Sequence, residues 1–268
     1  MIDYIKRAKH RLSLQRMPRE EREQILEDLR LQRLPSQMAT ETTLLKKRIR
    51  LLDAMAYLVS RQELFHDRKF DFSCDREHPL ILDCGANIGL ASIWFKTRYP
   101  QARITAFEPS PQVLPVLRHN LAVFELDDVT LVEAAAWTKS GEMTFAIGES
   151  DTGKLDNKPN AQSATVKSVR LRDYLCEPID FLKIDIEGVE VDVLADCAGA
   201  LDMVQRLSVE YHAPAEQPQQ LDRLLALLRE SGFRLYLDTV YAPEQPFHKI
   251  TTQCGFDLQI DISAVRPA

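Results

Sequence analysis

The sequence lacks several features that would assign it to a common class of protein. It has no apolar run of the roughly 18–20 residues that a membrane-spanning helix needs. Its five cysteines are scattered, odd in number and free of any Cys-x-x-Cys pair, which argues against a zinc site and favours reduced thiols in a cytoplasm. The first residues, MIDYIKRAKHRLSLQRM, carry charges where a secretory signal has its apolar region, so we expect a cytoplasmic protein. No nucleic-acid-binding motif is present, and nucleic acid is not an expected partner.

Charge is unevenly distributed along the chain. Residues 1–70 hold 16 Lys and Arg against 10 Asp and Glu, whereas the remainder holds 18 against 30. A basic segment beside an acidic body predicts either docking of one on the other or weak contact with an anionic surface. A solvated helical face is the simpler alternative.

The first 70 residues are predicted to form a helical extension. Pro18 precedes REEREQILEDLRLQRL, which fits a helix start with acids in the first turn. A broad apolar stripe over residues 44–59 predicts a second helix. We expect this extension to act as a lid over the sheet or as a homodimer contact. The polar stretch 71–79 marks the expected start of the main domain, residues 71–268.

From residue 80 onward, strand patterns alternate with helical patterns. This alternation of apolar, β-branched runs and helices predicts an α/β fold, a parallel sheet with helices on both faces. Two C-terminal strands without a helix between them predict one antiparallel insertion. The strands are expected in LILDCG, ARITAFEP, VTLVEAAAW, GEMTFAI, SATVKSVRL, DFLKIDIEG, QRLSVEYHA, FRLYLDTV and FDLQIDIS.

The stretch LILDCGANIGLASIWF, residues 80–95, reads as a strand, a glycine turn and a helix. Its spacing is Asp83-x-Gly85-x-Asn87-x-Gly89, not the G-x-G-x-x-G of a dinucleotide site, which disfavours a nicotinamide-dependent dehydrogenase. A carboxylate at the strand end suits a cationic ligand better than a pyrophosphate. S-adenosylmethionine has a sulfonium and an ammonium group, and its carboxylate can use backbone NH groups.

A second acid supports a nucleoside-containing ligand. Glu108 ends the next strand, 25 residues after Asp83, where a carboxylate can accept hydrogen bonds from both ribose hydroxyls. The turn and this acid together predict an adenosyl donor at the carboxyl ends of the strands.

Four segments carry a family resemblance: LILDCGANIG, ITAFEPSP, LVEAAAWTKSGEMTF and DFLKIDIEGVEVDVL. Together they resemble the FkbM-type methyltransferases, a branch of the class I enzymes that depend on S-adenosyl-L-methionine. The resemblance implies a Rossmann-like seven-stranded, mostly parallel sheet and methyl transfer, most often to a hydroxyl. The cofactor-binding residues it implies are Asp83, Gly85, Ala86, Asn87 and Gly89 after the first strand, Glu108 and Pro109 after the second, and Glu133, Ala134 and Ala135, beside adenine, after the third.

The strands LKIDIEG and SVEYHA carry the candidate catalytic residues Lys183, Asp185, Glu210 and His212. Charges at the ends of buried strands are costly unless they serve each other or a ligand, so we expect Asp185, Glu210 and His212 to converge. His212 is then the favoured general base for an acceptor hydroxyl. A divalent metal bound by these three residues is the alternative, and a buried polar network is the simplest interpretation. Lys183 fits an ion-pair partner of Glu187 or Glu210 better than a catalyst.

The sequence thus predicts a SAM-dependent O-methyltransferase acting on a small hydroxylated molecule such as a sugar, a glycolipid precursor or a polyketide. A non-catalytic binding module with the same fold is the alternative. N-methylation stays open, because loops 148–162 and 240–254, expected to build the acceptor pocket, do not name a ligand.

Overall fold

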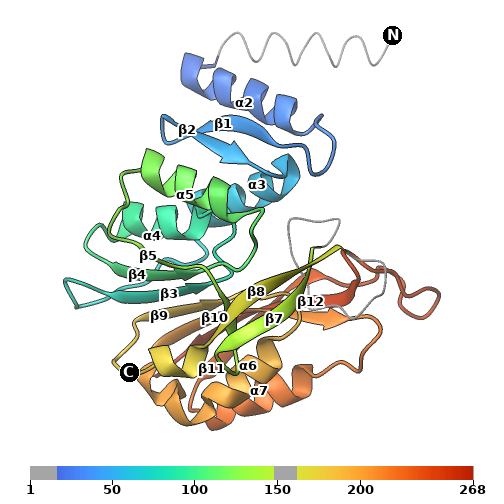
Figure 1. The fold of residues 1–268 in the computed structure, drawn as a ribbon. Helices are drawn as coiled ribbons and strands as arrows, with labels where there is room; N and C mark the ends of the chain where they lie inside the picture. Colours follow the sequence, from blue (N-terminus) through green and yellow to red (C-terminus); the bar gives the residue numbers. More distant parts are fainter. Residues whose placement is uncertain (1–16, 148–161, 268) are drawn as a thin grey trace.

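A twisted sheet of seven strands forms the centre of the computed structural model, which describes residues 17–147 and 162–267 (Figure 1). The strand order is β11-β12-β10-β9-β3-β4-β5, and β12 runs antiparallel to both of its neighbours. The predicted mostly parallel sheet and its antiparallel insertion are therefore confirmed. The strands are β3 (Leu80–Cys84), β4 (Arg103–Phe107), β5 (Thr130–Val132), β9 (Phe181–Ile184), β10 (Arg206–Pro214), β11 (Arg234–Tyr241) and β12 (Phe256–Val265).

Helices cover both faces of this sheet (Figure 1). On one face lie α4 (Leu90–Arg98) and α5 (Leu114–Val123), and on the other α6 (Glu190–Cys197) and α7 (Leu221–Glu230). Each face has its own cluster of buried apolar side chains. Burial on both sides explains why the central strands read as continuous apolar runs.

A smaller sheet holds β6 (Ala135–Trp137), β7 (Gly141–Ile147) and β8 (Gln162–Arg170) in the order β6-β8-β7. The single strand predicted in VTLVEAAAW is wrong, because the chain leaves the main sheet after Val132 and enters the small sheet at Ala135. Two short 3₁₀ helices, η2 (Leu171–Tyr174) and η3 (Ala198–Met203), follow β8 and α6 in the chain. Part of the expected acceptor loop, 148–161, lies outside the described residues.

The N-terminal extension is only partly helical. It contains α2 (Arg19–Leu31), β1 (Thr40–Leu44), β2 (Lys47–Leu51), α3 (Ala54–Arg61) and the π-helical turn η1 (Gln62–His66). The helix predicted across 44–59 is wrong in its first half, where β1 and β2 pair as a hairpin. Leu45 and Lys46 adopt positive φ angles of 48° and 66°, the backbone that a two-residue hairpin turn requires.

The extension packs against α5 and shares its hydrophobic cluster. The fully buried Asn120 of α5 joins them: its Oδ1 accepts from Arg50 N at 2.8 Å, and its Nδ2 donates to Arg50 O and Ile88 O. One amide thereby connects the hairpin, α5 and the glycine turn. No helix among residues 17–147 and 162–267 is both long enough and apolar enough to cross a membrane.

Candidate active site

The candidate site lies where the chain order in the sheet reverses, between β3 and β9. The carboxyl end of β3 and that of β9 touch here: Asp185 N donates to Cys84 O at 3.1 Å. Gly85 has a φ of +82°, and a Cβ at this position would lie 1.9 Å from Asp185 O. Only glycine permits this approach. Crevices at such reversal points are the usual ligand sites of open α/β sheets.

Four backbone NH groups of the glycine turn form hydrogen bonds with other groups of the protein. Gly85 N and Ala86 N both donate to Phe107 O, and Gly89 N donates to Ala86 O. Asn87 N donates to Glu108 Oε2 at 2.9 Å. These four NH groups are thus engaged in this arrangement, whereas the sequence favoured backbone NH groups as partners of a ligand carboxylate.

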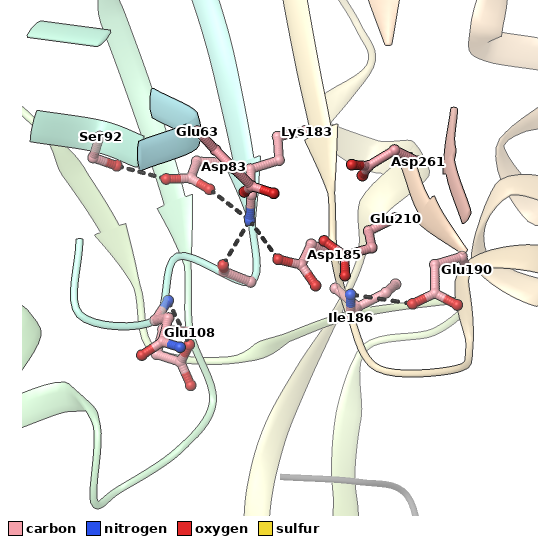
Figure 2. Close-up of polar contacts among 12 residues, drawn as sticks. Glu63, Asp83, Ser92, Glu108, Lys183, Asp185, Ile186, Glu190, Glu210 and Asp261 are labelled. Carbon is pink, nitrogen blue, oxygen red and sulfur yellow. Dashed lines mark hydrogen bonds and ion pairs between the residues drawn. The ribbon is translucent and has the colours of Figure 1, made fainter. Parts of the chain in front are cut away.

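Lys183 of β9 is at the centre of the polar contacts in Figure 2. Its Nζ donates to Gly85 O at 2.9 Å and lies 3.3 Å from Asp185 Oδ2 and 3.5 Å from Asp83 Oδ1. Burial opposes its charge, but Asp185 and Asp83 outweigh that effect and raise the pKa of Lys183 above its ordinary value. The sequence expectation that Lys183 is an ion-pair partner agrees with these contacts, although the partners are Asp83 and Asp185.

Asp83 lies beneath the turn with no exposed surface. Its Oδ2 accepts from Ser92 Oγ at 2.8 Å, which anchors the start of α4 (Figure 2). The carboxylate of Asp83 is therefore covered, and its contacts are with Lys183 and Ser92.

Glu108 follows β4 and faces the same turn. Its carboxylate accepts from Asn87 N (Figure 2) and also, across Pro109, from Ser110 N at 2.8 Å. Burial raises the pKa of Glu108 to about 7, although both NH groups favour the charged form. An ionised carboxylate has about four acceptor positions, so two remain for other donors.

The segment after β5 lies next to Glu108, whose NH donates to Val132 O at 3.1 Å. Glu133 pairs with Arg118 at the surface, Ala134 is buried, and Ala135 starts β6. The three residues expected beside adenine therefore follow the strand adjacent to Glu108.

Acids and one imidazole converge at the ends of β9 and β10. Ligand atoms of Asp185, Glu187 and His212 all lie within 4.8 Å of one another. His212 is buried, with Nδ1 3.0 Å from Glu190 Oε1 and Nε2 3.5 Å from Glu210 Oε1. The predicted convergence of Asp185, Glu210 and His212 agrees with this geometry. Glu187 was expected only as an ion-pair partner of Lys183, and Glu190 was not expected at the site, although both stand in the quoted motif DIEGVE, immediately after the strand.

Burial and neighbouring charges shift the pKa values of His212 and Glu187 in this cluster. Burial opposes protonation of the ring, but Glu190 and Glu210 outweigh it and raise the pKa of His212 well above its ordinary value. Burial, with help from Asp185 and Glu190, raises the pKa of Glu187 to about 8. A ring held in the charged form has no free lone pair to accept a proton, so a general-base role for His212 requires a change in these surroundings.

Two cavities flank the cluster. One of about 120 Å³ lies between the N-terminal extension and the sheet, lined by Tyr57 and Glu63 on one side and Gly85 and Asp185 on the other. The other, about 600 Å³, is lined by Glu187 and His212 and by Thr252, Cys254 and Gly255. The second volume suits a small molecule, and its wall includes part of the loop 240–254 expected to contact an acceptor.

Comparisons with known proteins agree on one family. A family model described as "Methyltransferase FkbM domain" matches residues 83–235. The chain is 30% identical over 231 residues to "Methyltransferase sdnD" of Sordaria araneosa, covering 72% of this chain and 88% of that one. It is 28% identical over 159 residues to "2-O-methyltransferase NoeI" of Sinorhizobium fredii, covering 51% and 65%. The crystal structure of methyltransferase FkbM from Methylobacillus flagellatus shares the fold, with a TM-score of 0.50 at 16% identity; the match covers 76% of this chain and 47% of that one.

Proposed function

This chain belongs to the FkbM methyltransferase family, and from that premise we propose that it moves a methyl group from S-adenosyl-L-methionine to a hydroxyl oxygen of a small molecule. The observation that supports the proposal best is the shared edge of the sheet. The glycine turn, Glu108 and the cluster of Asp185, Glu187 and His212 all lie at the carboxyl ends of neighbouring strands.

For the cofactor, Glu108 has the free acceptor positions that two ribose hydroxyls need. Gly85 to Gly89 would border the methionine part, with Asp83 and Lys183 holding the turn in place. The excess of carboxylates around Lys183 favours a sulfonium cation over a phosphate (Figure 2).

The reaction is an in-line displacement. The acceptor oxygen attacks the methyl carbon, the carbon–sulfur bond breaks, and its electron pair stays on sulfur, leaving S-adenosylhomocysteine. The hydroxyl proton leaves through the groups at the ends of β9 and β10, where we place the catalytic roles of Asp185, Glu210 and His212. Lys183 positions Asp185.

An oxygen acceptor is favoured because the Sinorhizobium relative is named a 2-O-methyltransferase. A sugar, a glycolipid precursor or a polyketide fits the 600 Å³ cavity beside Glu187 and His212. No comparison supports the non-catalytic alternative.

The role proposed for the N-terminal extension is that of a lid. Its residues Tyr57 and Glu63 line the smaller cavity opposite Gly85 and Asp185, so movement of α3 and η1 would open or close that space. A homodimer contact, weak binding to an anionic surface, the absence of a nucleic-acid partner and a cytoplasmic location stay predictions.

Isothermal titration with S-adenosylhomocysteine tests the cofactor. We expect micromolar binding that Glu108→Ala abolishes. Glu177→Ala is the matched control, since Glu177 is an exposed acid paired with Arg103, the residue that begins β4, at the opposite end of the strands. Absence of heat with the unaltered chain would end the proposal.

A further inference from the structure

We propose that Asp185, Glu187 and His212 bind one divalent cation. This inference rests on the proposed methyl transfer and deepens it, because the cation would hold and activate the acceptor hydroxyl. It differs from the sequence hypothesis in its ligands: Glu187 replaces Glu210.

The three side chains offer the right donor atoms at one point. Two carboxylate oxygens and one imidazole nitrogen lie within 4.8 Å of one another, and small side-chain rotations would bring all three to a common ion. They come from two adjacent strand ends, β9 and β10, that pair in parallel. Oxygen ligands with one imidazole suit Mg²⁺ or Mn²⁺.

The orientation of the His212 ring is what a metal ligand needs. Nδ1 lies 3.0 Å from the carboxylate of Glu190, which is itself completely buried and also accepts from Gly188 N at 2.9 Å. A carboxylate that accepts a hydrogen bond from Nδ1–H fixes the ring. A cation that displaces the Nε2 proton would then bind at Nε2, the usual arrangement around a metal-bound histidine. The loop that carries Glu187 is pinned by the same Glu190, whose Oε1 also accepts from Ile186 N (Figure 2).

Negative charge exceeds positive charge around the cluster. The nearby lysines are already engaged: Lys183 pairs with Asp83 and Asp185, and Lys69 pairs with Asp261 at 2.5 Å. The acids near Glu187 are Asp185, Glu190 and Glu210, with His212 as the cationic group among them. Carboxylates gathered in a partly dehydrated place are costly without a compensating cation, and a divalent ion supplies two charges at once.

The larger cavity supplies the remaining coordination positions. Glu187 and His212 both line the 600 Å³ space, so water molecules and the acceptor oxygen can approach the ion from that side. Bound to the cation, the hydroxyl loses its proton to solvent more easily. Its oxygen then forms the bond to the methyl carbon while the sulfur keeps the pair of the broken bond.

Titration of the full chain with Mn²⁺, followed by electron paramagnetic resonance of the free ion, tests the site directly. We expect one bound Mn²⁺ per chain, competed by Mg²⁺, and affinity at least tenfold weaker in Glu187→Gln and in His212→Gln. Asp192→Asn is the matched control, because Asp192 lines the same cavity but pairs with Arg223 outside the cluster. Binding of S-adenosylhomocysteine to each variant reports that it is folded.

Two results would overturn the site: no Mn²⁺ binding at millimolar concentration, or equal binding by the unaltered chain and both cluster variants. Either result combined with normal S-adenosylhomocysteine binding would leave the proposed methyl transfer intact. If the unaltered chain binds Mn²⁺ but not S-adenosylhomocysteine, the proposed methyl transfer is rejected and the cation site is retained.

Discussion

Replacing Glu108 by glutamine removes one titrating group from the candidate cofactor site. Glu108 is 6% exposed, and burial raises the pKa of its carboxyl group from 4.5 to about 7 despite hydrogen bonds from Asn87 N and Ser110 N. The folded chain therefore holds a proton on Glu108 at pH values where the unfolded chain has released it.

The sign and size of the effect follow from linkage. Because the folded state binds the extra proton between pH 4.5 and about 7, stability falls as pH rises through this window and is level above it. A shift of this size corresponds to roughly 3 kcal/mol in the free energy of unfolding. The unaltered chain should lose that amount between pH 4.5 and pH 8 relative to Glu108→Gln.

Urea unfolding of both proteins across this pH range measures the difference. Other groups that titrate contribute equally to both proteins, so the difference between the two curves isolates Glu108. Glu177→Gln, at an exposed acid, should keep the pH dependence of the unaltered chain. Parallel curves for the unaltered chain and Glu108→Gln would refute the raised pKa. In the same samples, affinity for S-adenosylhomocysteine should rise with pH through about 7 only while Glu108 is present, since ribose hydroxyls donate to the ionised form.

Three further substitutions test the glycine turn, the ion pair of Lys183 and the N-terminal hairpin. Gly85→Ala places a side chain at a positive φ, with its Cβ 1.9 Å from Asp185 O, and should lower the free energy of unfolding in urea by about 3 kcal/mol or more. The control Gly199→Ala meets only the end of the Arg172 side chain and should lower it by less than about 1 kcal/mol, so equal losses would contradict the close approach at Gly85. Lys183→Met leaves the carboxylates of Asp83 and Asp185 without their cationic partner and should destabilise the fold by about 3 kcal/mol, with a smaller loss at pH 5 than at pH 8. Unchanged stability would show that the lysine is dispensable. Lys46→Gly relieves a positive φ in the hairpin turn and should stabilise by about 0.5–1 kcal/mol in thermal unfolding, a gain that a helix at this position would turn into a loss.

Local patterns were sufficient for the main sheet. The apolar runs before Asp83, Glu108 and Asp185 predicted strands because two-sided burial leaves that trace in the sequence. The same regularity places strand ends at one edge, so the acids that follow those strands were correctly expected to lie near one another.

The hairpin of the N-terminal extension shows where such patterns fail. Apolar residues over 44–59 fit a helical stripe, yet Leu44 and Ile49 also fit alternating strands that bury one face. The side chain of Asn120 in α5, 70 residues from Arg50, forms hydrogen bonds with the NH and the carbonyl of Arg50 at the edge of β2. These bonds favour a strand over a helix at this position. Periodicity over a short segment cannot contain that information.

By itself, the sequence determined the order of strands and helices in most of the main sheet, the glycine turn and the acids that end the strands, because these depend on residue type and spacing along the chain. Only the tertiary structure decided that Asp83 is covered, that Lys183 joins it to Asp185, and that Glu187 and Glu190 face His212. Charges interact strongly only over a few ångströms. The neighbours of a side chain at a strand end belong to other strands, which lie far away in the sequence, so the sequence does not show which charges will meet.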